Sequence, residues 1–235
     1  MNDLDRLRRE YESRRRRLTN GNTYSLKNPT HRFITESRQR VLSKMLKENG
    51  LLDLKSMNLL EIGCGTGTVL DEYYQKGINP TALFGIDLLY DSLIDAQKKL
   101  LSANIYNADG QELPFRQESF TLVLQYTAFS SVLDPIIKKK MATEMLRVLK
   151  PRGKIIWYDF WWNPTNRQTR GIKLKEIRKL FPNCAYAFKK ITLAPPIARR
   201  FVPISLGIAR FLESLKIFNS HYLVVITKKD RKFPG

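Results

Sequence analysis

Cysteine, histidine and acidic residues are scarce in this sequence, and each shortage excludes a class of protein. Two cysteines and two histidines among 235 residues give neither a disulfide framework nor the spacing of a metal site. No apolar run is long enough to span a bilayer, and the charged N-terminus lacks the apolar centre of a signal peptide. We therefore expect a metal-free globular protein of the reducing cytoplasm.

Acidic residues are outnumbered, because 22 Asp and Glu stand against 41 Lys and Arg, for a formal net charge of +19. A chain of this charge is expected to associate with polyanions at low salt. The run Arg14–Arg17 adds to this expectation. Nucleic acid and an anionic membrane surface are therefore candidate partners, beside a merely solvated basic surface, and the oligomeric state is not indicated.

The most informative stretch covers residues 58–68 and reads NLLEIGCGTGT. A short apolar run followed by alternating glycines is typical of a buried parallel strand that turns tightly into a helix. Glycine tolerates positive φ, and without a Cβ it lets a ligand lie against the backbone. The spacing Gly63-x-Gly65-x-Gly67 differs from the dinucleotide fingerprint G-x-G-x-x-G. Glu61 would repel a pyrophosphate, but it suits a ligand with an ammonium or sulfonium group.

This stretch resembles motif I of the class I S-adenosylmethionine-dependent methyltransferases, in which the loop holds the methionine end of the cofactor. Two further strings resemble the same family. DGQELPF at 109–115 is similar to its adenine segment, and LRVLKPRG at 146–153 is similar to its helix–turn–strand after motif III. The resemblance implies a doubly wound α/β fold with a seven-stranded, mostly parallel, Rossmann-like sheet.

The resemblance also implies S-adenosylmethionine as cofactor, S-adenosylhomocysteine as product, and no metal. Asp87 ends the second expected strand, where an acid can accept both ribose hydroxyls. Asp91 is available to cap the next helix, which leaves Asp87 free, and Asp109 is expected to accept from the adenine amine. Cys64 is interpreted as a small space-filling residue. The residues expected to contact the cofactor are Glu61, Gly63, Cys64, Gly65, Gly67, Asp87, Leu88, Asp109, Gly110, Gln111 and Gln125.

Candidate catalytic groups are His31 and Asp159. Asp159 ends the fifth expected strand, where it would bind or deprotonate an acceptor hydroxyl, and its alternative is a structural turn aspartate. His31 has the alternative of an ordinary surface histidine. Ligands bind outside the carboxyl ends of the strands in such sheets. The residues after the fourth strand that are expected beside the methyl group and acceptor are Gln125, Tyr126, Phe129 and Ser130.

We divide the chain into an N-terminal helical arm and cap, residues 1–50, and a methyltransferase domain, residues 51–235. The arm begins with an arginine-rich helix over 2–18, which is expected to dock loosely. A second helix, capped by Thr30, is expected to fold over the cofactor as in the family. It would bring His31 and Arg38 to the pocket, together with Tyr24 from the segment before it.

The acceptor stays open at this level, and the leading interpretation is a small molecule such as a hydroxylated metabolite, a sugar or a secondary-metabolite intermediate. The tetrad of amino-methylating DNA enzymes, Asn/Asp/Ser-Pro-Pro-Tyr/Phe, is absent after the fourth strand. RNA is an alternative because of the charge. A lipid or quinone at a membrane surface is another, because basic and apolar residues alternate over 197–216; core packing against the sheet is the simplest interpretation of that segment. A non-catalytic cofactor-binding module is the last alternative.

Overall fold

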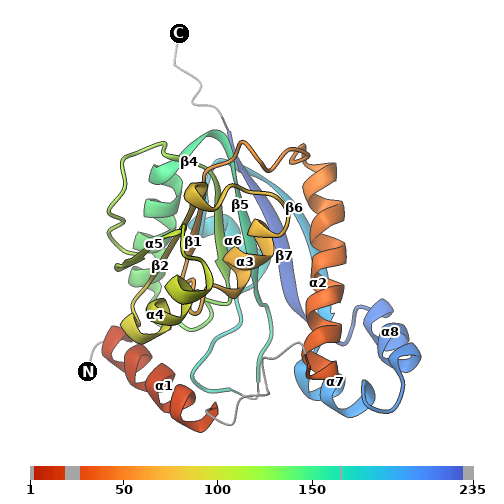
Figure 1. Ribbon diagram of the computed structural model, residues 1–235. Helices are drawn as coiled ribbons and strands as arrows, with labels where there is room; N and C mark the ends of the chain where they lie inside the picture. Colours follow the sequence, from red (N-terminus) through yellow and green to blue (C-terminus); the bar gives the residue numbers. More distant parts are fainter. Residues whose placement is uncertain (1–2, 19–26, 165, 230–235) are drawn as a thin grey trace.

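The computed structural model describes residues 3–164 and 166–229 except 19–26, and of α1 it describes the side chains only as far as Ser13 (Figure 1). The strands are β1 (Leu59–Ile62), β2 (Leu83–Asp87), β3 (Asn104–Asn107), β4 (Phe120–Tyr126), β5 (Leu149–Phe160), β6 (Cys184–Leu193) and β7 (Asn219–Lys228). The helices are α1 (Asp3–Leu18), α2 (Pro29–Glu48), α3 (Thr68–Tyr74), α4 (Tyr90–Lys99), α5 (Pro135–Val148), α6 (Leu174–Leu180), α7 (Pro195–Phe201) and α8 (Leu206–Ser214), with a short 3₁₀ turn η1 (Pro80–Ala82). None of the helices so described is long and apolar enough to cross a membrane.

All seven strands form one sheet in the order β3-β2-β1-β4-β5-β7-β6. Neighbouring strands are parallel except for β7, which runs antiparallel to both β5 and β6. The predicted doubly wound, seven-stranded, mostly parallel sheet is therefore confirmed. The chain order reverses at β1, which lies between β2 and β4, and a crevice forms outside the carboxyl ends of strands at such a switch point.

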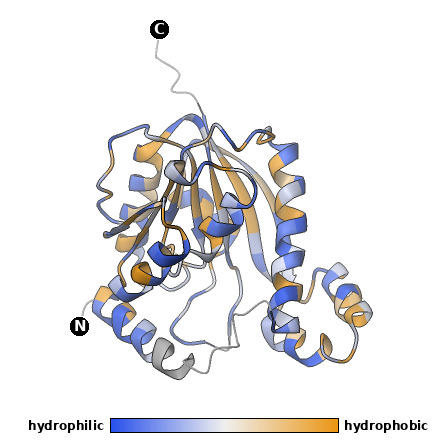
Figure 2. Cartoon of the chain, viewed as in Figure 1, coloured by the Kyte–Doolittle hydropathy of each residue, from blue (hydrophilic) through white to orange (hydrophobic). Residues whose placement is uncertain are grey.

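Helices cover both faces of the sheet (Figure 1), and many residues of the strands are hydrophobic (Figure 2). On one face, α2, α3 and α4 bury Leu42, Leu70 and Leu93 against the strands. On the other face, α5 and α6 bury Met145 and Ile177. Side chains alternate between faces along each strand, so this layering decides which residues reach the crevice.

Two predicted helix caps are wrong. Asn28, not Thr30, caps α2, because its Oδ1 accepts from Thr30 N at 2.9 Å and from His31 N at 3.2 Å, and Pro29 is the first helical residue. α4 begins after Leu89 without a side-chain cap, and Asp91 lies inside its first turn.

The N-terminal helix is docked more specifically than predicted. Asp3 Oδ2 accepts from Leu133 N at 2.7 Å and from Asp134 N at 2.9 Å, while an Arg6 guanidinium nitrogen donates to Ser131 O at 2.6 Å. The start of α1 therefore holds the loop that follows β4. The side chains of Arg14–Arg17, and Tyr24, lie outside the described residues. The division of the chain at residue 50 stays a prediction.

Segment 195–217 forms two short helices on the outside of α2. Ala198, Val202 and Ala209 are buried against Phe33 of α2 and Leu193 of β6. The predicted core packing holds for this inner side only. Large apolar side chains remain exposed on the outer side of α8.

Candidate active-site crevice

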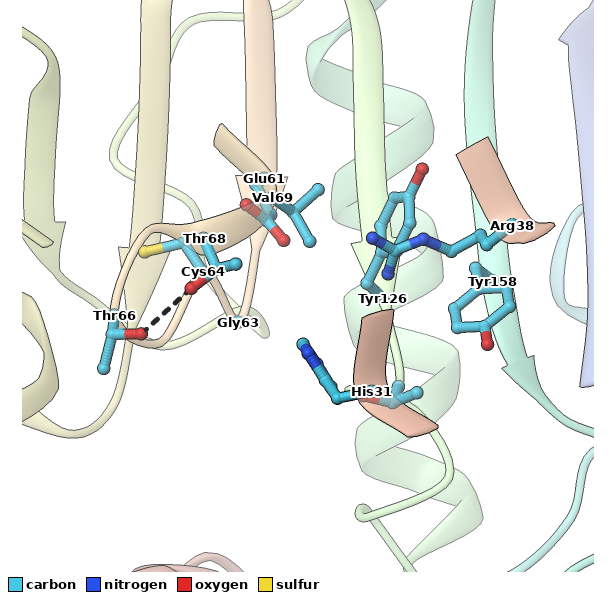
Figure 3. Close-up of a pocket in the computed structure, with 11 residues that line it drawn as sticks. His31, Arg38, Glu61, Gly63, Cys64, Thr66, Thr68, Val69, Tyr126 and Tyr158 are labelled. Atoms are coloured by element: carbon cyan, nitrogen blue, oxygen red, sulfur yellow. Dashed lines mark hydrogen bonds between the residues drawn. The ribbon is translucent and has the colours of Figure 1, made fainter. Parts of the chain in front are cut away.

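A cavity of about 310 Å³ opens between the loop after β1 and helix α2 (Figure 3). The loop and the start of α3 form one wall, and α2 with the ends of β4 and β5 forms the other. The residues that line the cavity are His31, Arg38, Glu61, Gly63, Cys64, Thr66, Thr68, Val69, Tyr126, Thr127 and Tyr158.

The glycine loop has the backbone that only glycine adopts readily. Gly63, Gly65 and Gly67 have φ of 73°, 51° and 71°, all in the left-handed region. A Cβ on Gly67 would stand 3.1 Å from the Cβ of Ala96, so α4 packs directly against the loop. Burial raises the pKa of the Cys64 thiol, which fits a space-filling residue and not a nucleophile.

Glu61 is the acidic group of the cavity. Its side chain is 2% exposed, and its Oε2 has no hydrogen-bond partner among the described residues. Burial raises its pKa well above the usual range; Glu72 adds to the rise, and Arg38 opposes it. A buried carboxylate oxygen without a donor, beside a backbone cradle of glycines, fits a ligand that brings an ammonium group. The residues present therefore suit the methionine end of S-adenosylmethionine.

Asp87 is not free, contrary to prediction. Its Oδ2 accepts from Gly65 N at 2.8 Å, and its Oδ1 accepts from Leu89 N at 2.9 Å. The carboxylate thus ties the glycine loop to the end of β2. A role in binding ribose stays a prediction.

The expected adenine segment lies outside the cavity lining. Asp109 accepts from the backbone N and the side-chain Nε2 of Gln111, both at 2.9 Å, so the two residues form a local turn. Gly110 is buried against Met141 and Ile62. Leu88 is half-buried after β2. The adenine contacts of these residues stay predictions.

Arg38 organises the opposite wall. Its guanidinium pairs with Glu72 of α3 and stands over the rings of Tyr126 and Tyr158, 5.1 and 5.4 Å from their centroids. Burial opposes the charge, but Glu72 and the two tyrosines raise the pKa of Arg38. Burial also raises the pKa of Tyr158 to about 12. Glu72 escaped the sequence analysis, because only the crossing of α2 over α3 brings it to Arg38.

His31 lies between the two walls, with its side chain directed at the gap that separates the glycine loop from Arg38 (Figure 3). Burial lowers the pKa of its imidazole, and the positive charge of Arg38 lowers it further, against the opposing effect of Glu72. The imidazole is therefore neutral in neutral solution and able to accept a proton. This geometry suits the general base for which His31 was a candidate.

Asp159 lies on the other face of the sheet. It is fully buried, its Oδ2 accepts from Ser130 N at 2.9 Å and from Gln125 Nε2 at 3.3 Å, and its Oδ1 accepts from Phe160 N at 2.8 Å. Burial raises its pKa to about 6. Its surroundings match the structural turn aspartate, and neither Asp159 nor Gln125 lines the cavity. Their catalytic and cofactor roles stay predictions without geometric support.

Two of the residues predicted to lie beside the acceptor do not line the cavity. Phe129 and Ser130 are fully buried, and the Phe129 ring lies 4.8 Å from that of Trp157 on the α5 side of the sheet. Tyr126 does line the cavity. Among the residues that the structure describes, no three His, Cys, Asp or Glu side chains gather closely enough to hold a metal ion.

Comparisons with known proteins point to methyltransferases. Residues 59–153 match a family model described as a methyltransferase domain. A ubiquinone/menaquinone biosynthesis C-methyltransferase of Rickettsia massiliae is 26% identical over 204 residues, which cover 82% of this chain and 75% of that protein. A phthiotriol/phenolphthiotriol dimycocerosates methyltransferase of Mycobacterium ulcerans is 30% identical over 117 residues, which cover 49% of this chain and 41% of that protein.

The fold is also found among solved structures. The PH0226 protein of Pyrococcus horikoshii OT3 has a TM-score of 0.61 at 18% identity, over 85% of this chain and 91% of that one. The family model covers the glycine loop, Asp87 and residues 146–153, which join α5 to β5 and are among the parts that carry the resemblance. These matches and the sheet topology support a class I S-adenosylmethionine-dependent methyltransferase, an enzyme that takes its methyl group from S-adenosylmethionine.

Proposed function

We propose that the enzyme methylates a lipophilic small molecule that carries a hydroxylated ring, with His31 as the group that takes up the hydroxyl proton. The observation that carries the proposal is the position of His31: a neutral imidazole faces the gap between the glycine loop and a wall of two tyrosine rings. Aromatic rings favour flat apolar ligands, and one basic nitrogen beside them supplies a specific polar contact.

The size of the cavity supports a small acceptor. At about 310 Å³ it lies at the lower end of the range of ligand pockets, roughly 300–1,000 Å³. Helix α2 covers it, and the Arg38–Glu72 ion pair fixes α2 to α3. The part of this space beside His31 and the two tyrosines, which the methionine end of the cofactor would leave open, suits a single ring.

When bound, S-adenosylmethionine supplies a methyl group on a positively charged sulfur. His31 accepts the proton of the acceptor hydroxyl. Negative charge then develops on the hydroxyl oxygen and on the ring carbon next to the one that bears it. Either atom is then a nucleophile toward the methyl group, and S-adenosylhomocysteine would be the leaving group. On carbon, the methyl group would replace a ring hydrogen, whose proton passes to the oxygen as the ring becomes aromatic again. Whether oxygen or carbon receives the methyl group is therefore left open. The charge of Arg38 disfavours the protonated imidazole, and it thereby promotes return of the proton to water. The wall of Arg38, Tyr126 and Tyr158 is placed to align the acceptor.

The printed names of the relatives support the same class of acceptor. One names ubiquinone and menaquinone biosynthesis, and another names phthiotriol and phenolphthiotriol dimycocerosates, all of them lipophilic molecules. The identities are low, so these names support the chemical class and no individual substrate.

The test is transfer of tritium from methyl-labelled S-adenosylmethionine into a host lysate, which is then separated into polar metabolites, organic-extractable lipids, RNA and protein. We expect label in the organic fraction, above a blank with Gly65→Arg. Label in RNA alone would contradict the proposal and favour the alternative suggested by the charge of the chain.

The role of His31 as proton acceptor is tested with purified variants. The substrate is an unlabelled extract of the fraction that takes up label. His31→Gln should lower kcat by about 10²–10⁴ and leave the affinity for S-adenosylhomocysteine unchanged. Asp159→Asn is the matched control, because the group is buried away from the cavity; it should change kcat by less than about tenfold, below the contribution of a general base. The reverse ranking of the two variants would assign the base to Asp159.

A further inference from the structure

A second surface, separate from the cavity, lies on α7 and α8. Its inner side is fixed: Ala198, Val202 and Ala209 are buried, and both carboxylate oxygens of Glu213 lie 2.7 Å from Ser37 Oγ of α2. The two helices stand beside the N-terminal end of α2 (Figure 1). They form an ordered part of the fold with one side toward solvent.

Several residues of α8 are hydrophobic (Figure 2), and large apolar side chains of this region are exposed. We call these exposed residues the α8 patch: Ile204, Leu206, Ile208, Phe211, Leu215 and Ile217. Phe211 is 62% exposed and Ile217 is 70% exposed. Ile208 and Phe211 of α8 and its C-cap residue Leu215 follow the spacing of one helix face, while Ile204, Leu206 and Ile217 lie at or beyond the ends of the helix. Exposed apolar residues gathered in this way mark an interaction surface, whereas scattered ones do not.

The α8 patch belongs to a basic segment of the chain. Segment 195–217 contains four basic residues, Arg199, Arg200, Arg210 and Lys216, and all four are exposed. Its one acidic residue, Glu213, is turned inward to Ser37. The outward surface is therefore apolar and cationic at once.

We propose that the α8 patch docks on an anionic lipid bilayer, with its apolar side chains among the acyl chains and its cations at the headgroups. This occupant satisfies both properties, since interfacial helices combine an apolar face with basic residues that attract anionic lipid. A second copy of the chain, docked through the same patch, would bring its own four cations against these four, and like charges repel. RNA would pair with the cations but leave the apolar side chains in water.

The docking surface and the cavity share helix α2. Phe33 packs toward α7 and α8, while His31 and Arg38 of the same helix line the cavity. A bilayer at the α8 patch thus lies one helix away from the cavity. The inference rests on the surface itself and holds for any acceptor.

The experiment is flotation of the full chain with vesicles of phosphatidylcholine alone or with added phosphatidylglycerol, in the absence of any acceptor. We expect binding to the anionic vesicles to be at least about tenfold tighter than to the neutral ones. Phe211→Asp with Leu215→Asp should weaken it by at least about tenfold. The control, Leu101→Asp with Ile136→Asp, adds the same charge at two exposed apolar positions elsewhere and should change binding by less than about twofold.

A second variant, Arg199→Gln with Arg200→Gln, changes only exposed side chains and should also weaken binding to anionic vesicles. Unchanged affinity for S-adenosylhomocysteine shows that each variant is folded. The proposal is overturned if wild-type protein fails to float, or if the patch and control variants lose binding equally. It is also overturned if the patch variant instead abolishes a dimer or the binding of a homopolymer RNA.

Discussion

The two walls of the cavity are held in different ways. The wall after β1 is held mainly through its backbone: Gly63 N and Cys64 N both donate to Ile86 O at 2.9 Å, and Gly65 N donates to the side-chain carboxylate of Asp87. The wall formed by α2 is held by long side chains, chiefly Arg38 against Glu72 and the rings of two tyrosines.

The difference matches the two ligands of a methyltransferase. A backbone cradle keeps its shape when side chains change, which suits a cofactor that never varies. A wall of side chains can be rebuilt by substitution, which suits an acceptor that differs among enzymes of one fold. Variants on each side should therefore fail in different ways.

The largest effect is expected from Gly67→Val, which attacks the backbone wall. The new side chain meets Ala96 while φ stays in the left-handed region, for a cost of about 2–5 kcal/mol from strain and overpacking. We expect a large drop in the unfolding temperature and no measurable binding of S-adenosylhomocysteine by calorimetry.

Gly65→Ala is the matched control, because no atom lies within 4 Å of its added Cβ. It should destabilise the protein by only about 1–2 kcal/mol, the cost of the left-handed backbone. Equal stability of the two variants would refute the packing of α4 against the loop.

A smaller effect is expected from Arg38→Met in the side-chain wall. Breaking the pair leaves Glu72 buried and uncompensated, at a cost of about 3 kcal/mol, the lower end for buried pairs, because the side chains keep 12% and 10% exposure. Chemical denaturation measures the loss. The double variant Arg38→Met with Glu72→Leu should recover much of it, and strict additivity of the two single losses would show that the pair is not coupled.

The smallest effect is expected from Glu61→Gln, which keeps the shape of the backbone wall and removes only its charge. The dissociation constant of S-adenosylhomocysteine, which carries the ammonium group, should rise about 10–100-fold, as for loss of a hydrogen bond to a charged group.

The same variant has a predictable pH dependence. The pKa of Glu61 is higher in the folded than in the unfolded protein, so the folded state holds the extra proton and loses stability as pH rises above about 4.5, the unfolded value. Gln does not titrate. Without cofactor, the variant should match wild-type protein below that pH and exceed its unfolding temperature increasingly above it. An advantage that shrinks with rising pH would contradict the burial of the charge.

The backbone wall was largely predictable, because three glycines with positive φ leave a visible spacing in the sequence. Which side chains of β4 and β5 face the crevice was predictable too, but the prediction placed Gln125 and Asp159 on the wrong face. Tyr126 pairs with Tyr158 in the register, and Gln125 pairs with Trp157 on the opposite face. Successive side chains of a strand point to opposite faces, so Asp159, which follows Tyr158, points away from the crevice.

Other features depend on tertiary structure that no local pattern contains. The partnership of Arg38 with Glu72 requires two helices to cross, and their separation in sequence gives no periodic signal. The amphipathic pattern of 197–216 predicts a helix with an apolar side. It does not tell whether that side faces the sheet or solvent, and in α8 small residues such as Ala209 take the buried positions.

The docking of α1 has a consequence for the order of events during synthesis. Asp3 bonds to Leu133, which lies 130 residues later in the chain. At about 5–20 residues per second, the ribosome needs roughly 6–26 s to make this partner after Asp3 itself. Helix α1 therefore cannot dock until the loop after β4 has been made. Its many arginines suit that interval, because a charged helix can wait in water without aggregating.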